Sequence, residues 1–201
     1  MNFSWTPLIV AIVISYLTGS IPTAYLIARV LKGIDIREIG SGNVGATNVW
    51  RNVGRGAGVL TLVIDAVKGF LPVFILKYFI SGGEVLIYAS ALAVVSGHIW
   101  TPWLEFKGGK GVATGTGVLA ALSIYSMLFG LGIFIIVLTA TKYISASSIS
   151  GAIAASFFCW IDVGTPVSFK VIMTILCVLI IIRHKDNIRR LIAGNETKLK
   201  I

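Results

Sequence analysis

Long runs of apolar residues, separated by short polar stretches, dominate this chain. No charged residue occurs at positions 1–28 or 111–141, and further apolar runs cover residues 59–80, 85–100, 147–160 and a last segment that ends at Arg183. A turn at residues 81–84 separates the second run from the third. A water-soluble protein needs charged side chains to cover its surface over such stretches. The pattern therefore predicts an all-α integral membrane protein.

The uncharged stretch at residues 111–141 decides the number of spans. As a single helix it would be about 46 Å long, whereas the hydrocarbon core is about 30 Å thick. A break near residues 123–126 gives two shorter helices and seven transmembrane helices in total. The basic tail then lies on the same side as the basic loops at residues 33–58 and 97–114, as the bias of Lys and Arg towards the cytoplasm requires. We expect the N-terminus outside and the C-terminus in the cytoplasm.

Composition supports this class and excludes others. Of the 201 residues, 56% are hydrophobic and 12% are charged, and the mean hydropathy is +0.92. Too few polar residues remain for a separate soluble domain, so we expect one domain over residues 1–201. The net charge of +9 fits basic cytoplasmic loops, and no nucleic-acid partner is expected. Cys159 and Cys177 lie inside apolar runs without metal-ligand spacing, so no metal site is expected.

The first polar loop contains the glycine-rich segment GSGNVGATNVWR at residues 40–51. It matches the GxGxxG pattern of dinucleotide sites, but it follows a membrane span and not a β-strand, so that class is excluded. Glycines expose backbone N–H groups, Ser41 and Thr47 add hydroxyls, and Arg51 adds a planar cation. Such a segment suits a phosphate group. The alternative is a simple connector in which Ser41 or Asn43 caps an interfacial helix.

The second polar loop continues from Gly97-His98 to FKGGKGVAT at residues 106–114. Its glycines lead into an apolar helix, and this arrangement is expected to direct free amides and Lys110 at an anion. Gly111 stands where a Walker A motif has Ser or Thr, so ATP hydrolysis is not supported. The alternative is that Lys107 and Lys110 only mark the cytoplasmic interface.

Two further groups of polar residues complete the candidate chemistry. His184 and Asn187, three residues apart in the basic tail, share a face if the last helix continues, although the tail also suits an amphipathic segment on anionic lipid. Asp65 and Lys68 lie inside the second apolar run, where an isolated charge is costly. We expect these two residues to form an ion pair that positions the loops.

The three polar segments together resemble the signatures of the PlsY family, the bacterial membrane acyltransferases that use acyl phosphate. SGNxGATNxxR matches residues 41–51, the glycine-rich second signature is similar to residues 97–114, and HxxNIxRLxxGxE matches residues 184–196. One departure is visible, because Thr101 and Trp103 stand where family members commonly have Pro and Phe.

The resemblance implies seven membrane helices in the bacterial inner membrane, with all three signatures at the cytoplasmic face. It implies transfer of a fatty acyl group from acyl phosphate to the 1-hydroxyl of sn-glycerol 3-phosphate, which gives lysophosphatidic acid and phosphate as the first step of phospholipid biosynthesis. Neither acyl-CoA nor a cofactor is expected. The expected partners are acyl phosphate, glycerol 3-phosphate, membrane lipids and a soluble acyl phosphate synthase. The His-x4-Asp motif of the other large group of glycerophosphate acyltransferases is missing, since Trp103 and Arg189 occupy its Asp positions.

By motif position, the resemblance implies that Arg51, Lys110, His184 and Asn187 hold glycerol 3-phosphate. It also implies that Ser41 and the amides of residues 42–47 hold the acyl phosphate, whose own phosphate oxygen accepts the hydroxyl proton, with His184 as the alternative base. The other residues expected to bind substrate are Gly42, Asn43, Gly45, Ala46, Thr47, Asn48, His98, Lys107, Gly108, Gly109, Gly111, Thr114, Arg190 and Glu196.

A small transporter or binding protein for a phosphate-bearing lipid or metabolite is the alternative function. Transporters commonly contain internal repeats and helices broken at the membrane midplane. No repeat is apparent in this sequence. The acyltransferase function is therefore favoured.

Overall fold

A computed structural model describes residues 5–80 and 83–199, and within these ranges the regular structure is entirely helical. Part of the turn expected at residues 81–84 lies outside the described residues. The chain forms two compact units that divide between Leu122 and Ser123. The first unit contains α1 (Trp5–Ser20), α2 (Thr23–Lys32), α3 (Ala46–Asn52), α4 (Arg55–Phe79), α5 (Gly83–Ile99), the short 3₁₀ helix η1 (Pro102–Leu104) and α6 (Val112–Leu122). The second contains α7 (Ile124–Thr141), α8 (Ile144–Ile161), α9 (Val167–Arg183) and α10 (Lys185–Ile192).

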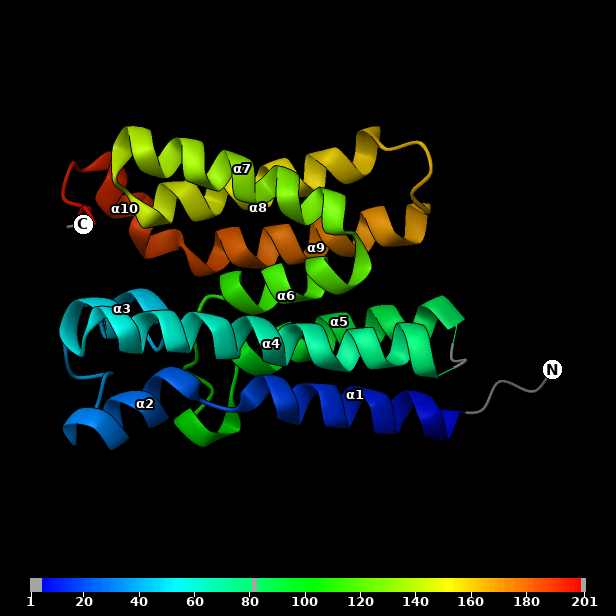
Figure 1. Ribbon diagram of the computed structural model, residues 1–201, viewed down its shortest axis with the longest axis horizontal. Coiled ribbons are helices and arrows are strands. Elements are labelled where there is room, and N and C mark those ends of the chain that lie inside the picture. The colour runs from blue at the N-terminus through cyan, green and yellow to red at the C-terminus, as the bar shows by residue number, and fades with distance from the viewer. Residues whose placement is uncertain (1–4, 81–82, 200–201) are drawn as a thin grey trace. The chain divides into compact units, whose positions relative to one another are not determined.

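Glycines allow close helix packing in the first unit, where α1 lies against α5 and α4 against α6 (Figure 1). A Cβ atom added to Gly69 of α4 would overlap the carbonyl oxygen of Thr114, and one added to Gly117 of α6 would overlap that of Ala66. The two backbones therefore touch along this contact. Small residues at such positions let membrane helices approach closely where the hydrophobic effect contributes little.

The first apolar run is interrupted at Ile21-Pro22, between α1 and α2. Proline lacks a backbone N–H and disfavours helical geometry in the residue before it, which explains why the helix stops here. The predicted first span remains one candidate membrane segment, Trp5–Lys32, although its helix is interrupted. The interruption leaves the carbonyls at the end of α1 without helical partners.

The second unit begins at the break near residues 123–126 that the length of the uncharged stretch and the distribution of basic residues predicted. Ser123 has extended backbone geometry and its hydroxyl accepts a hydrogen bond from the amide of Ser126 at 3.3 Å, which caps α7. Gly130 of α7 packs closely on Gly151 and Ala155 of α8. The last two helices, α9 and α10, meet at His184 with a bend of 58°. The last helix therefore does not continue straight, which was the condition for His184 and Asn187 to share one helix face.

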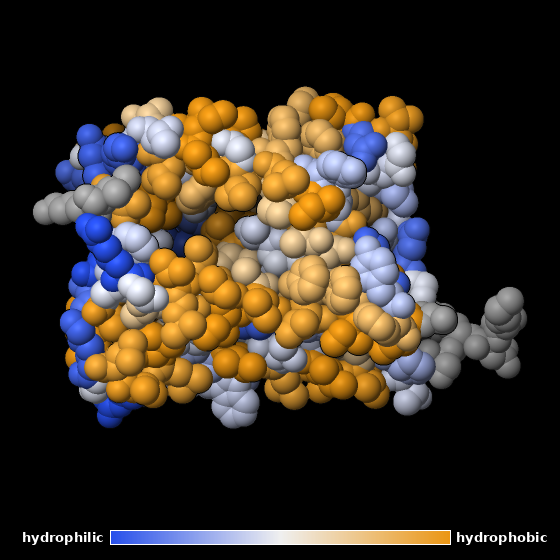
Figure 2. Space-filling model, in the orientation of Figure 1, coloured by the Kyte–Doolittle hydropathy of each residue, from blue (hydrophilic) through white to orange (hydrophobic). Residues whose placement is uncertain are grey.

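Five segments of the described residues are long and apolar enough to cross a membrane, and a sixth is added if α9 and α10 count as one bent span. On the face shown in Figure 2, apolar residues cover the sides of the helices, whereas hydrophilic residues gather at their ends. The 11 residues of α6 extend for only about 16 Å, well short of the hydrocarbon core. The chain is thus a multi-pass membrane protein.

Candidate functional site

The first signature, residues 41–51, occupies the end of the loop after α2 and most of α3, and Asn48 organises it. The Asn48 amide donates hydrogen bonds to the carbonyls of Ile36 and Ile39, both at 3.0 Å, and its oxygen accepts one from the Ser41 amide at 3.2 Å. Only 2% of Asn48 is exposed. A buried amide with this many partners fixes the path of the backbone that presents Ser41.

Glycine geometry and apolar anchors complete this loop. Gly40 and Gly42 have φ angles of +64° and +67°, which favour glycine. Val44 and Val49 are buried in an apolar cluster together with Ile36, which ties the loop to α2. The amides of Gly42 and Gly45 donate to the carbonyls of Ile39 and Asn43, respectively. Ser41 and Arg51 are exposed at the surface of the first unit.

The second signature folds back on the end of α5. The Gly108 amide donates to the carbonyl of Ile99 at 3.0 Å, and the Gly109 amide donates to that of His98 at 3.1 Å. The expectation that these amides are free to bind an anion is therefore wrong. The two glycines are needed for close approach, since a Cβ on either would overlap atoms of His98.

The lysines of this segment differ in their surroundings. Lys107 lies at the surface, where its side chain is 77% exposed and pairs with Glu105 at 3.4 Å. Lys110 is half-buried and directly precedes Gly111, whose φ of +83° turns the chain into α6. Thr114, in the first turn of α6, is buried with its backbone against α4. Of these two lysines, Lys110 is therefore the one whose position the surrounding fold restricts more.

The ion pair predicted within the second apolar run is confirmed. The Lys68 ammonium lies 2.7 Å from the Asp65 carboxylate, and both side chains are buried. His98, at the end of α5, is also buried, and its Nδ1 lies 3.7 Å from the same carboxylate. His98 was expected to bind substrate, but its burial favours a role in supporting the glycine loop.

The third signature, residues 184–196, lies in the second unit. His184 stands at the junction of α9 and α10, and its Nδ1 lies 2.7 Å from the carbonyl oxygen of Ile180. Because a carbonyl only accepts hydrogen bonds, we assign the ring proton to Nδ1. A neutral His184 then offers Nε2 as its acceptor.

The Glu196 carboxylate accepts hydrogen bonds from three polar side chains around this signature. Its Oε1 accepts hydrogen bonds from the Asn187 amide at 2.7 Å and the Ser145 hydroxyl at 2.8 Å, and its Oε2 accepts one from Arg190 at 2.7 Å. Partial burial raises the pKa of the Glu196 carboxyl, but these donors outweigh burial and hold the pKa below its usual value. Glu196 is therefore a charged acceptor that fixes Asn187.

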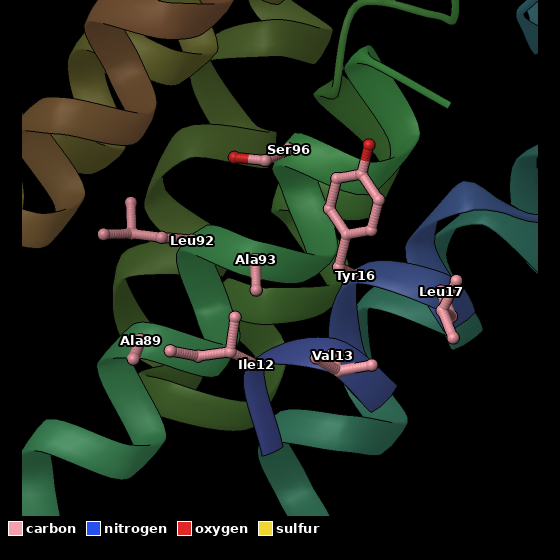
Figure 3. Close-up of a pocket in the computed structure, with 8 residues that line it drawn as sticks. All are labelled: Ile12, Val13, Tyr16, Leu17, Ala89, Leu92, Ala93 and Ser96. Atoms are coloured by element: carbon pink, nitrogen blue, oxygen red, sulfur yellow. The ribbon is translucent and has the colours of Figure 1, made fainter. Parts of the chain in front are cut away.

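A separate groove lies between α1 and α5 (Figure 3). Its volume is about 500 Å³, and its lining is mostly apolar, with the Tyr16 and Ser96 hydroxyls as its polar groups. None of the residues that line it is charged or belongs to the three signatures. The groove is therefore not the phosphate site. Among the described residues, no group of three His, Cys, Asp or Glu side chains suits a metal ion.

Known proteins closely resemble this chain. The family model described as glycerol-3-phosphate acyltransferase matches residues 9–194. A glycerol-3-phosphate acyltransferase of Prochlorococcus marinus (strain MIT 9215) is 47% identical over 95% of this chain and 97% of its own. One from Endomicrobium trichonymphae is 43% identical over 96% of each chain.

Two solved structures of PlsY, an integral membrane glycerol 3-phosphate acyltransferase, share this fold. Its glycerol 3-phosphate form is 40% identical, with a TM-score of 0.90 over 96% of each chain. Its lysophosphatidic acid form is 39% identical, with a TM-score of 0.87 over 96% of this chain and 95% of the other. Sequence and fold agree over nearly the whole length, and the chain therefore belongs to the glycerol-3-phosphate acyltransferase family.

Proposed function

We propose that this protein transfers a fatty acyl group from an acyl phosphate to the 1-hydroxyl of sn-glycerol 3-phosphate, and releases lysophosphatidic acid and phosphate. The observation that carries the proposal is the likeness, at 40% identity over 96% of each chain, to a solved acyltransferase in its glycerol 3-phosphate form. The lysophosphatidic acid form of that protein is equally relevant, because it holds the expected product. The family model covers residues 9–194, which include all three signatures.

The acyl phosphate donor is supported by the signatures themselves. Residues 41–51, 97–114 and 184–196 match the PlsY pattern, and the His-x4-Asp motif is missing at both histidines. An acyl phosphate already contains a good leaving group, so the enzyme needs mainly to place the reactants and neutralise charge. Cationic and amide-bearing side chains suit that task better than a covalent nucleophile with its base.

The first and second signatures provide the groups for phosphate. We assign Arg51 and Lys110 to the phosphate of glycerol 3-phosphate, because a guanidinium binds phosphate through paired N–H groups and an ammonium acts as a point charge. Ser41 is assigned to the acyl phosphate. Its position on a backbone fixed by Asn48 supports this role, since a preorganised donor loses less entropy on binding.

The third signature provides neutral hydrogen-bonding groups for the same acceptor substrate. His184, with its proton on Nδ1, offers Nε2 to a hydroxyl, and the Asn187 amide, fixed by Glu196, offers polar contacts to the glycerol. A neutral imidazole and an amide position a hydroxyl without adding further positive charge. His184 is also the group that would accept the proton if the donor does not.

The reaction balances without any additional reactant. The oxygen of the 1-hydroxyl bonds to the acyl carbonyl carbon, and the bond from that carbon to the phosphate oxygen breaks. The leaving phosphate keeps the electron pair and takes up the hydroxyl proton, so the donor itself supplies the base. Arg51 and Lys110 then stabilise the charge that develops on phosphate.

We further propose seven membrane spans in the bacterial inner membrane, with the N-terminus outside and the signatures at the cytoplasmic face. The count takes α6 as the short span that the broken stretch at residues 111–141 requires. Labelling of single cysteines introduced into the loops, from either side of intact membranes, tests this topology. For that purpose the buried Cys159 and Cys177 are first replaced by Ala.

The decisive test is product formation by the purified protein in lipid or detergent. The reaction contains palmitoyl phosphate and glycerol 3-phosphate without added metal, and a parallel reaction contains palmitoyl-CoA. Lysophosphatidic acid from palmitoyl phosphate alone is the expected result. Product from palmitoyl-CoA alone contradicts the proposed donor, and no product from folded protein with either donor contradicts the proposed reaction.

A further inference from the structure

Four buried polar side chains, Asp65, Lys68, His98 and Thr101, gather where α4, α5 and the break between α1 and α2 meet. Asp65 and Lys68 form the ion pair at 2.7 Å. Burying two charges is costly unless additional hydrogen bonds satisfy them, so such pairs in membrane helices commonly have a specific task.

One side of this cluster stabilises the helix break. The Lys68 ammonium donates to the carbonyl of Ile21 at 2.8 Å, and the Thr101 hydroxyl donates to that of Ser20 at 2.6 Å. Ser20 is the last residue of α1 and Ile21 follows it, so neither carbonyl has a partner within that helix, although the Ile21 carbonyl also accepts the Thr23 amide at 3.0 Å. A lysine of α4 and a threonine of the second signature thus satisfy them.

The other side of the cluster supports the glycine loop. The His98 ring has the Asp65 carboxylate 3.7 Å from Nδ1, and a Cβ atom on Gly109 would overlap its Nε2. The backbone carbonyl of His98 also accepts the Gly109 amide. The ring therefore lies between a fixed carboxylate and the residue that precedes Lys110.

The cluster does not have room for a substrate. The cavity that its side chains line has a volume of only about 10 Å³, no more than one water molecule needs. Glycerol 3-phosphate is much larger than water. The groups must therefore act on the reaction through the backbone that they support.

We infer that Asp65, Lys68 and His98 are positioning residues that set the backbone of the second signature, and with it Lys110, against the break between α1 and α2. This inference rests on the proposed role of Lys110 in binding a substrate phosphate. The ion pair orients His98, and the His98 ring supports the glycine loop. Loss of the pair should loosen that loop while the rest of the fold remains.

The test uses Lys68→Met and the double variant Asp65→Asn/Lys68→Met in the full-length protein. The double variant leaves no unpaired charge, so it remains informative if Lys68→Met does not fold. The matched control is Lys77→Met, because Lys77 lies on the same helix and also donates to backbone carbonyls, those of Ala121 and Leu122. Thermal unfolding verifies that each variant is folded.

The first readout is the steady-state kinetics with palmitoyl phosphate and glycerol 3-phosphate. We expect kcat/KM to fall by about ten-fold or more in both cluster variants, mostly through a higher KM for glycerol 3-phosphate, because a displaced binding group is costly even when it is intact. Lys77→Met should match the wild type. Equal losses in Lys77→Met and the cluster variants overturn the inference, because they would reflect general destabilisation.

The second readout does not depend on activity. Trypsin cleavage after the exposed Lys107, followed by mass spectrometry, reports on the mobility of the loop. Faster cleavage in the folded cluster variants than in the wild type and Lys77→Met supports the inference. Unchanged cleavage together with unchanged kinetics overturns it. If the wild type forms no product at all, the proposed function fails, whereas cleavage still decides the structural part.

Discussion

The carboxylate of Glu196 fixes the side-chain amide of Asn187 through a hydrogen bond of 2.7 Å. The same carboxylate holds Ser145, at the start of α8, and Arg190 of α10. A residue near the C-terminus thereby joins two helices around an amide that we assign to substrate. Glu196 is for this reason a positioning residue in our interpretation, although the sequence alone suggested direct contact with substrate.

Replacing Glu196 with Gln should destabilise the protein by about 1–3 kcal/mol, since hydrogen bonds to a charged acceptor are lost or weakened. Activity should fall further through misplacement of Asn187. The matched control is Asp186→Asn, because Asp186 forms an exposed ion pair with Arg189 at 3.5 Å, worth at most about 1 kcal/mol. Chemical unfolding in detergent measures both variants, and equal effects of the two substitutions would contradict the role given to Glu196.

The depressed pKa of Glu196 predicts an acid-sensitive fold. A carboxyl whose folded pKa lies below its usual value of 4.5 contributes stability above that pH, and this contribution disappears as the pH falls through the folded pKa. The melting temperature of the wild type should therefore drop below about pH 4.5. The drop should be shallower in Glu196→Gln, and superimposable pH profiles would show that this carboxyl does not contribute.

Arg51→Ala and Lys110→Ala should each abolish transfer with folding intact, because both remove positive charge assigned to phosphate. Lys170→Met, which changes a lysine outside the signatures that bonds to the Trp160 carbonyl, should keep wild-type activity. The assay is lysophosphatidic acid formation at saturating donor. Full activity in either alanine variant would remove that residue from the proposed phosphate site.

Asn48→Asp tests the backbone of the first signature with almost no change in size. The substitution replaces the amide donor to Ile36 and Ile39 with a second acceptor, so the Ile36 carbonyl loses this donor, whereas the Ile39 carbonyl keeps only the Gly42 amide. A buried group left without a partner costs about 1–3 kcal/mol, and the Ser41 loop should lose its geometry. Asn195→Asp, at an exposed position, is the control. Equal stability and activity in the two variants would exclude an organising role for Asn48.

Gly117→Ala should destabilise the first unit, because its new Cβ would overlap the carbonyl oxygen of Ala66. Gly132→Ala in α7 is a suitable comparison, since its Cβ would meet no atom within 4 Å. That second substitution should be neutral or stabilising, by up to about 1 kcal/mol from helix propensity. Thermal unfolding of the two variants side by side checks the sign of each effect.

The features best predicted from the sequence are those that depend on residues close together along the chain. Runs of apolar residues predicted most helices, and the excess length of residues 111–141 together with the bias of basic residues towards one side predicted the break that Ser123 caps. The spacing of Asp65 and Lys68 predicted their ion pair, because residues three apart on a helix face each other. Apart from the bias of basic residues, each of these predictions depends on neighbouring positions.

Other features depend on how distant segments meet, and the sequence did not reveal them. Whether the Gly108 amide is free depends on the return of its loop to the Ile99 carbonyl, which no local pattern specifies. The role of Asn48 likewise follows from the path of the loop around it. The interruption at Pro22 did have a visible signal, since a proline inside an apolar run commonly ends a helix.

The short helix α6 begins well along α4, where Thr114 meets Gly69, and not beside the N-terminal end of α4. Lys110, just before α6, is half-buried and therefore less open to solvent than a surface lysine such as Lys107. Salt screens partly buried charges less than exposed ones, because the counterions, whose screening length is about 8 Å at physiological ionic strength, remain in the water. An anion held by Lys110 should bind with little dependence on salt, which sets this site apart from the basic residues exposed on α10.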